Sequence, residues 1–526
     1  MRASHFLMST VGFWLLAVPA HAQERRKVEV APYLGIDQVV VAPIEGGGDV
    51  LTYTNVTAGV TASVQTRRLE VGADVQYNHS FGWGEQLSDQ DVISGIVAGR
   101  LAVAPGLALN AGAMATRVRT DGLSGAAVRN DDLTSQVYAA YFGPSYAGRV
   151  GDLNVNASYR LGYARVDDDV NVGPFRGGGF AESWTHDLMG SVGVSPGVWM
   201  PLGLVASAGY SREEASQLDQ RFEDKWGRLD ATLPISPTLA LVGGVGYEDI
   251  AISQRSPLLD SNGAPVISSS GRYVTDESSP RQLIYEFDDI IWDVGVLWRP
   301  SRRTSLEARV GERYGGMTYS GSFIWHGRNQ SLALVVFDGI DSFGRVITSN
   351  VASVSGSDLN VVRNPFTGDF TGCAFSVTGG GQCFNDALSG ITAANFRYRG
   401  VAMQYAAERG PWAMGVGLGY SQRKFVTPSG ETVFVRGTRD QNWYGNASLT
   451  YHVDRQSSID TAVYVNYFDA SGARLDVLNL GAFTSYYRLV SRNLQASASV
   501  GVDSAKADDL DTVISAMGQI GLRYNF

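Results

Sequence analysis

The sequence predicts an all-β fold: a transmembrane, antiparallel, up-and-down β-barrel of about 22 strands, or about 20 if one hairpin is lost. Three observations predict this fold. Apolar and polar residues alternate with a period of two in many segments. The connections between these segments alternate between short and long. The composition is rich in glycine and aromatic residues and poor in charge.

The composition sets limits on the class of protein. The chain has 526 residues, of which 18% are charged and 44% are hydrophobic, and it contains 62 glycines. Soluble domains usually carry about 25% charged residues and about 7% glycine. Two cysteines exclude a multiple-disulfide scaffold and a four-thiolate zinc site. The net charge of −10 disfavours a nucleic-acid partner, since phosphates call for Lys and Arg.

Residues 1–22 are predicted to be a cleaved signal peptide. Arg2 supplies the positive start, residues 6–18 are mostly apolar, and Ala20-His21-Ala22 fits a cleavage site that leaves Gln23 as the mature start. The apolar run is too short to cross a hydrocarbon core of about 30 Å as a helix. Residues 23–526 contain no apolar run of 18 residues, so we expect them to form a single barrel that crosses the membrane with strands.

The C-terminal segment shows the alternation most clearly. One face carries Ile514, Ala516, Gly518, Ile520, Leu522, Tyr524 and Phe526, and the other carries Ser515, Met517, Gln519, Gly521, Arg523 and Asn525. A membrane strand needs about 9–11 residues, whereas strands of soluble sandwiches have about 5–6. Segments 153–163, 412–421 and 442–451 repeat the pattern, with aromatic residues near their ends, where interface girdles belong.

The other strands follow from the connections. Short turns rich in Gly, Pro and Asn alternate with mostly longer connections, as in outer-membrane barrels. An even strand number places both termini on the same, periplasmic side. Strand cores are predicted at residues 28–41, 51–65, 69–81, 92–103, 107–119, 135–148, 153–166, 184–194, 202–211, 222–233, 239–252, 284–298, 304–314, 318–326, 331–337, 397–409, 412–426, 439–453, 458–468, 473–490, 494–504 and 511–526. The reversal at 314–318 is the least secure of the hairpins.

The sequence shows two resemblances to known families. Leu522, Tyr524 and the terminal Phe526 resemble the sorting signal of bacterial outer-membrane proteins, which implies a Gram-negative outer-membrane location and the barrel assembly machinery as a partner during biogenesis. The stretches 243–249, 292–311 and 314–323 are similar to barrel proteins associated with exosortase (PEP-CTERM) and exopolysaccharide systems. The second resemblance implies a cellular context and no assigned activity.

Two long insertions bear on whether the lumen is open. Only residues 23–27 precede the first predicted strand, so no N-terminal plug domain is expected, and a TonB-dependent receptor is disfavoured. Long external loops are predicted at about 253–283 and 338–396. Either insertion could instead fold inward and constrict an otherwise wide lumen, and the sequence leaves both arrangements open. Cys373 and Cys383 lie in the second insertion, and a disulfide is expected there because the compartment is oxidising.

Charged residues separate by position. The short turns carry arginines, and the long connections carry aspartates such as Asp167–Asp169 and Asp508-Asp509, which could bind cations bridging lipopolysaccharide or lie simply in solvent. The alternation places several charged side chains toward the lumen, where they could select ions or pair with one another. These lumen-facing candidates are Arg160, Asp293, Glu307, Arg309, Arg313, Arg423 and Arg523.

No enzyme, cofactor or metal motif is recognisable. The spacing Gly415-x-Gly417-x-Gly419 belongs to the small face of a strand, because no helix follows it. The sequence therefore predicts a porin-like outer-membrane channel or transporter for small solutes or saccharides, with residues 338–396 as its candidate gate. The alternative is a closed structural or accessory barrel of an envelope or exopolysaccharide export assembly. The sequence leaves the oligomeric state open, and lipid and lipopolysaccharide are the expected surroundings.

Overall fold

The computed structural model describes residues 27–46, 48–84, 87, 89–119, 134–168, 179–268, 272–426, 439–470, 476–507 and 511–526. The predicted signal peptide and the acidic residues Asp169, Asp508 and Asp509 lie outside these ranges, so the predictions made for them stay predictions. The same holds for an N-terminal plug domain, which would precede Lys27. Among the described helices, none has the length and apolar character that a membrane crossing requires.

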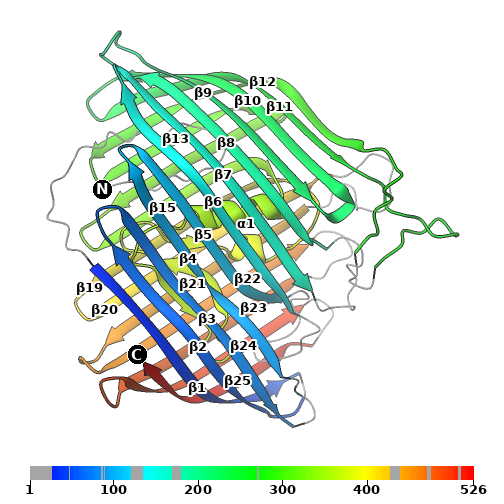
Figure 1. Ribbon diagram of the computed structural model, residues 1–526, viewed down its shortest axis with the longest axis vertical. Helices are drawn as coiled ribbons and strands as arrows, with labels where there is room; N and C mark the ends of the chain where they lie inside the picture. The colour runs from blue at the N-terminus through cyan, green and yellow to red at the C-terminus, as the bar shows by residue number, and fades with distance from the viewer. Residues whose placement is uncertain are drawn as a thin grey trace.

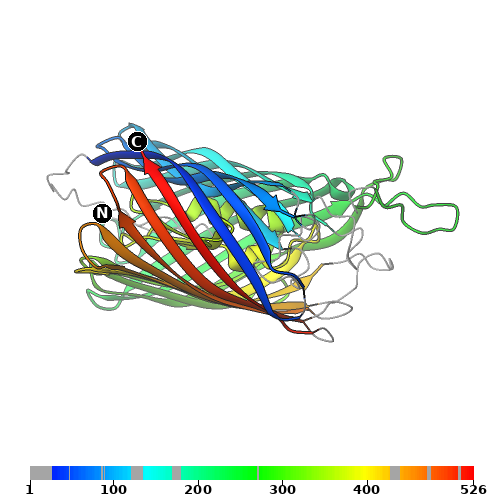
Figure 2. The ribbon, with the colours of Figure 1, turned by 90° about the horizontal axis from the view of Figure 1, so that it is seen from below.

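Twenty-two strands form one closed antiparallel ring (Figures 1 and 2). Each strand of the ring pairs with the ring strands before and after it along the chain. The first strand pairs with the last, from Tyr33 opposite Asn525 onwards. The predicted all-β barrel and its strand number are thus confirmed. The 314–318 hairpin exists, because Tyr314 and Gly315 both have positive φ (58° and 69°) and form a two-residue turn that suits paired strands.

The first half of the ring comprises β1 (Lys27–Glu45), β2 (Leu51–Gln65), β3 (Leu69–Trp83), β4 (Gln90–Ala104), β5 (Leu107–Arg119), β6 (Thr134–Val150), β7 (Leu153–Asp168), β8 (Glu182–Val194), β9 (Gly203–Ala215), β10 (Gln220–Pro234) and β11 (Leu239–Gln254), with the short helical turn η2 (Gln217–Asp219) before β10. The second half comprises β12 (Gln282–Ser301), β13 (Thr304–Arg313), β14 (Gly316–His326), β15 (Gln330–Asp341), β19 (Phe396–Arg409), β20 (Trp412–Phe425), β21 (Arg439–His452), β22 (Ser457–Ala470), β23 (Val477–Leu489), β24 (Leu494–Ala507) and β25 (Val513–Asn525).

The two ends of the barrel differ. Ten short turns, together with the start of β1 and the end of β25, lie at one end, which we call the turn end (Figure 1). The longer connections lie at the other end, the loop end. The 253–283 connection projects beyond the loop end (Figure 2), and isolated bridges such as Pro257 to Thr275 hold its two arms together. This position agrees with the external loop predicted at about 253–283.

The two faces of the barrel wall differ in polarity. Side chains on the outer face are apolar and exposed, as at Ile520 (68% exposed), Val500 (66%) and Ile290 (61%). Side chains on the inner face are often polar and buried, as at Ser94, Thr116 and Ser135. The period-two alternation of the sequence therefore separates an apolar exterior from a polar interior.

Of the two arrangements that the sequence left open for the 338–396 insertion, an external loop or an inward fold, the structure has the inward one. Strand β15 continues to Asp341, and residues 342–395, here called the plug, fold inside the barrel (Figures 1 and 2). The plug contains helix α1 (Phe343–Ser353), the small antiparallel sheet of β16 (Asn360–Arg363), β17 (Phe370–Phe375) and β18 (Gln382–Cys383), and the short helix α2 (Asn385–Leu388). The physical reason is its apolar content, since Phe343, Phe366 and Phe384 need burial that a surface loop cannot provide.

Candidate functional site

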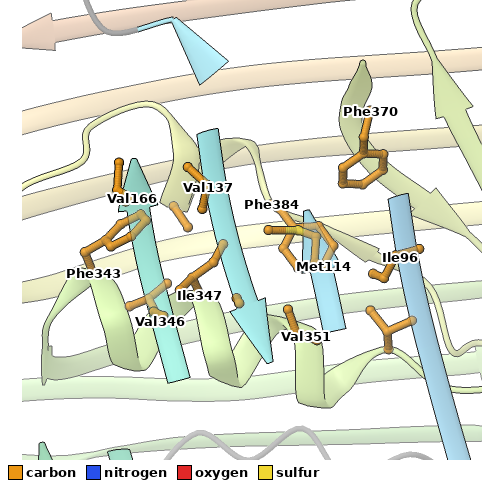
Figure 3. Packing of buried hydrophobic residues seen from close by; sticks show 14 of the residues in the cluster. Ile96, Met114, Val137, Val166, Phe343, Val346, Ile347, Val351, Phe370 and Phe384 are labelled. Atoms are coloured by element: carbon orange, nitrogen blue, oxygen red, sulfur yellow. The ribbon is translucent and has the colours of Figure 1, made fainter. Parts of the chain in front are cut away.

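The plugged lumen is the candidate functional site. Helix α1 seats the first part of the plug on the inner face of β5–β8. Its apolar residues recur at helical spacing, and Ile347 and Val351 are fully buried. Figure 3 shows Phe343 and Ile347 directed toward the strands that carry Val137 and Val166. Contact with the wall, more than intrinsic propensity, stabilises this eleven-residue helix.

A polar contact fixes the start of α1. The Oγ atom of Ser342 accepts a hydrogen bond from the backbone N–H of Arg345 at 3.2 Å, as an N-cap does. The same hydroxyl donates to the carboxylate of Glu213 on β9. The guanidinium of Arg345 lies over the ring of Phe222 on β10, 3.8 Å from the ring centroid. The helix is therefore anchored both to apolar strands and to polar groups of the wall.

Partly buried ion pairs join the small sheet of the plug to β3–β5. Arg363 of β16 pairs with Asp74 of β3 at 2.7 Å. Arg117 of β5 pairs with Asp369, which precedes β17, at 2.8 Å. The side chains of these pairs are between 11% and 20% exposed, so water screens them only partly. Each pair supplies a directional contact between plug and wall.

Wall side chains also satisfy backbone carbonyls of the plug. Tyr53 and Asn55 donate to the carbonyl of Phe366 at 3.2 and 2.9 Å. Gln76 and Ser94 donate to the carbonyl of Gly368 at 2.9 and 3.0 Å. A buried carbonyl without a partner costs about 1–3 kcal/mol, so these inward polar residues stabilise the seated plug.

The disulfide lies where the plug packs closely against β20. Cys373 and Cys383 face each other across β17 and β18 and are bonded, as expected from the sequence. A Cβ atom on Gly417 would lie 2.4 Å from Sγ of Cys383, and one on Gly415 would lie 2.3 Å from the ring of Phe375. The glycine face of β20, visible in the sequence as an alternating pattern, makes room for the plug.

The end of the plug meets β19–β22. Arg423, one of the predicted lumen residues, pairs with Asp440 at 3.1 Å and donates to the carbonyl of Gly390. Tyr398 donates to the carboxylate of Asp386 in α2. Burial raises the pKa of Asp386 to about 6, although the nearby Arg423 opposes this shift. Asp386 is thus a carboxyl group of the plug whose charge changes near pH 6.

The other predicted lumen charges also have partners inside the barrel. Arg309 contacts Glu307, Asp230 and Asp293 at 2.7–2.9 Å, and Arg160 pairs with Asp187 at 2.7 Å. Arg313 pairs with Glu248. The guanidinium of Arg523 lies 3.5 Å from the centroid of the Tyr33 ring. Of the two interpretations that the sequence left open, paired wall charges describe this arrangement better than a free selectivity ring.

Sequence reasoning missed the wall residues that hold the plug, including Asp74, Ser94, Arg117 and Glu213. The sequence does not distinguish these residues, because inward polar residues are expected in any barrel. The plug itself gave a stronger signal, since Phe343, Val346, Ile347 and Val351 have helical spacing within a supposed loop. The residues of the predicted sorting signal, Leu522, Tyr524 and Phe526, lie on the outer face, 46–67% exposed.

No family model matches the chain, and no curated protein matches its sequence. Several solved structures are similar in overall form. The closed form of the ferric-catecholate import receptor Fiu from E. coli K12 is 10% identical, with a TM-score of 0.43 over 94% of this chain and 82% of that one. The FrpB iron transporter from Neisseria meningitidis is 11% identical, with a TM-score of 0.43 over 94% and 81%.

The alcaligin outer-membrane receptor FauA from Bordetella pertussis is 12% identical, with a TM-score of 0.38 over 96% of this chain and 77% of that one. Identities and TM-scores this low assign no family to the chain.

Proposed function

We propose that this protein is an outer-membrane β-barrel channel for small solutes, closed at rest by the plug and opened when the plug shifts within the lumen. The observation that carries this proposal is the folded segment 342–395 inside a ring of 22 strands. Barrels of this strand number enclose a lumen far wider than side chains alone can fill. A plug is then the element that decides whether solutes pass.

The outer surface supports the membrane placement. Exposed apolar residues cover the strands, and aromatic residues such as Trp298, Trp412 and Tyr524 lie near the turn end. Aromatic girdles mark the two interfaces of outer-membrane barrels. We place the turn end, with both chain ends, in the periplasm, because outer-membrane barrels have short periplasmic turns and long external loops.

The contacts of the plug support its movement. Many of them are hydrogen bonds and ion pairs, such as Arg363 with Asp74 and Gln404 with the carbonyl of Ala374. When the plug shifts, water can replace such contacts at a modest net cost, because a hydrogen bond contributes only about 0.5–1.5 kcal/mol. The resemblance to exosortase-associated barrels suggests saccharides as the first solutes to test.

A cross-linking experiment tests this function. The double variant Asp74→Cys/Arg363→Cys replaces the ion pair between β3 and the plug with two thiols, which a cleavable bifunctional reagent can bridge. We expect disaccharide flux into proteoliposomes to fall to background after bridging and to return after cleavage. The wild type, treated identically, controls for effects on the Cys373–Cys383 disulfide. A variant with residues 342–395 replaced by a short Gly-Ser linker gives the flux of the open barrel.

The outcomes separate the two candidate functions. Flux that disappears on bridging supports a channel opened by plug movement. Flux that is unchanged by bridging would show that solutes bypass a fixed plug. An inactive wild type beside an active plug-less variant would contradict the channel and favour a closed structural barrel, which the extensive burial of the plug also allows.

A further inference from the structure

We propose that the turn end carries a ring of arginines that binds the phosphate groups of anionic phospholipids in the adjacent leaflet. The members, here called the arginine ring, are Arg67, Arg68, Arg149, Arg302, Arg303, Arg328, Arg409, Arg455 and Arg492. This inference rests on the proposed membrane placement and is independent of whether the barrel conducts. Its ligand class is the anionic phosphodiester headgroup.

All nine side chains are exposed. None of them forms an ion pair or a side-chain hydrogen bond with the residues that the structure describes, in contrast to the paired arginines of the lumen. The turns contain two acidic residues that are engaged locally, and Glu408 lies beside Arg409 at the end of β19. Asp454 accepts from the backbone N–H of Gln456 at 2.6 Å, and Asp152 accepts from the indole of Trp199 at 3.3 Å. The turn end therefore presents an excess of positive charge, since the nine arginines outnumber these acidic residues.

The distribution of the arginines favours lipid over a protein partner. In this barrel the order of strands around the ring is the order in the sequence. The arginines belong to seven of the ten turns, from β2–β3 at one point of the ring to β23–β24 almost a full circuit later. A protein partner would dock on one sector of the rim. A leaflet surrounds the whole circumference, as these residues do.

Aromatic residues indicate the depth in the membrane at which the arginines lie. Trp298, Trp412, Tyr524 and Phe526 are 41–67% exposed on the outer face near the turn end, and Trp412 pairs directly with Arg409 across its hairpin. Aromatic girdles lie at the level of the headgroups. On the hairpins of Trp298 and Trp412, Arg302 lies four residues after Trp298 and Arg409 lies opposite Trp412, so both arginines are within reach of lipid phosphates.

Arginine suits this ligand. Its planar guanidinium makes two parallel hydrogen bonds to phosphate oxygens, and its long aliphatic stem can lie along apolar surface while the charge reaches the headgroup. Attraction to an anionic surface contributes about 1 kcal/mol per basic residue close to it.

Quenching of tryptophan fluorescence by brominated lipids tests the proposal. The folded barrel is reconstituted with brominated phosphatidylglycerol or brominated phosphatidylcholine in mixtures with the unbrominated lipids. We expect phosphatidylglycerol to be favoured roughly threefold or more at low salt. Replacing all nine arginines by glutamine should reduce this preference to about one. Salt at about 1 M should do the same to the wild type, because exposed charges are then screened.

Two matched variants locate the effect. Arg302→Gln/Arg303→Gln/Arg328→Gln removes three members of the ring, and Arg165→Gln/Arg212→Gln/Arg221→Gln removes three arginines near the loop end. The first should weaken the preference and the second should leave it unchanged. An unchanged preference in the nine-residue variant, or a wild-type preference that persists in high salt, would overturn the arginine ring. Absence of quenching by either lipid would instead show that the membrane placement is wrong.

Discussion

At the scale of single residues, Asp386 is a carboxyl group of the plug whose pKa is raised by burial. Its carboxylate, in α2, accepts from Tyr398, and the charged Arg423 is already paired with Asp440. Burial raises the pKa of Asp386 from 3.8 to about 6. The folded barrel therefore prefers the protonated form. The stabilisation that this group provides is fully present below its unfolded pKa and is lost as the pH rises through about 6.

The raised pKa of Asp386 predicts how the stability of the barrel depends on pH. Between pH 4.5 and pH 7.5 the wild type should lose about 1–2 kcal/mol of unfolding free energy more than Asp386→Asn, which cannot ionise. Urea unfolding of both proteins at the two pH values measures the difference. Comparing the two proteins cancels the contributions of all other carboxyl groups. Equal pH dependence in the two proteins would show that Asp386 has an ordinary pKa.

At the scale of elements, helix α1 packs against a wall position where glycine leaves space for it. Gly162 of β7 faces the helix, and a Cβ atom placed there would lie 2.3 Å from Oγ1 of Thr185 and 3.1 Å from the side chain of Thr348. Thr348 is fully buried, and its hydroxyl donates to the carbonyl of Gly344 one turn earlier in α1. The helix therefore has little room to move away from a larger residue at position 162.

A valine at position 162 should therefore unseat α1. We expect Gly162→Val to destabilise the plug by about 1–3 kcal/mol, the usual cost of overpacking, while the barrel still assembles. Protease cleavage within residues 342–395 should increase, measured on the reconstituted protein. Gly190→Val on β8 is the matched control, because the nearest atom to its added Cβ lies 4.0 Å away. Equal protease resistance of the two variants would contradict this role of Gly162.

At the scale of the whole molecule, the two faces of one strand should respond differently to charge. Ile520 of β25 is exposed on the outer face, and its neighbour Gln519 faces the interior. A lysine on the lipid face near the middle of the membrane costs about 2–4 kcal/mol. We expect Ile520→Lys to lower the free energy of unfolding by an amount in this range, and Gln519→Lys to lower it by less.

Folding of both variants into lipid bilayers from urea measures these free energies. The comparison is internally controlled, because the two positions are adjacent and receive the same side chain. A larger loss at Gln519 than at Ile520 would mean that the apolar exterior does not face lipid. That result would contradict the membrane placement on which both proposals depend.

The sequence alone determined the ring. Period-two alternation is a local property, and it fixes which residues face outward before any strand finds its neighbour. Tight turns then determine which strands pair. For this reason the sequence predicted the strands and their even number. It also predicted that residues such as Arg309 and Arg423 face the interior.

Only the tertiary structure decided the place and contacts of the plug. Residues 342–395 contain a helix and short strands whose burial depends on partners distant in the sequence: Arg363 meets Asp74, 289 positions away, and Tyr53 meets Phe366, 313 positions away. No local pattern encodes such contacts, because a loop outside the barrel and a plug inside it have the same sequence neighbours. The closed ring alone brings these residues together, so whether the lumen is open depended on the three-dimensional fold.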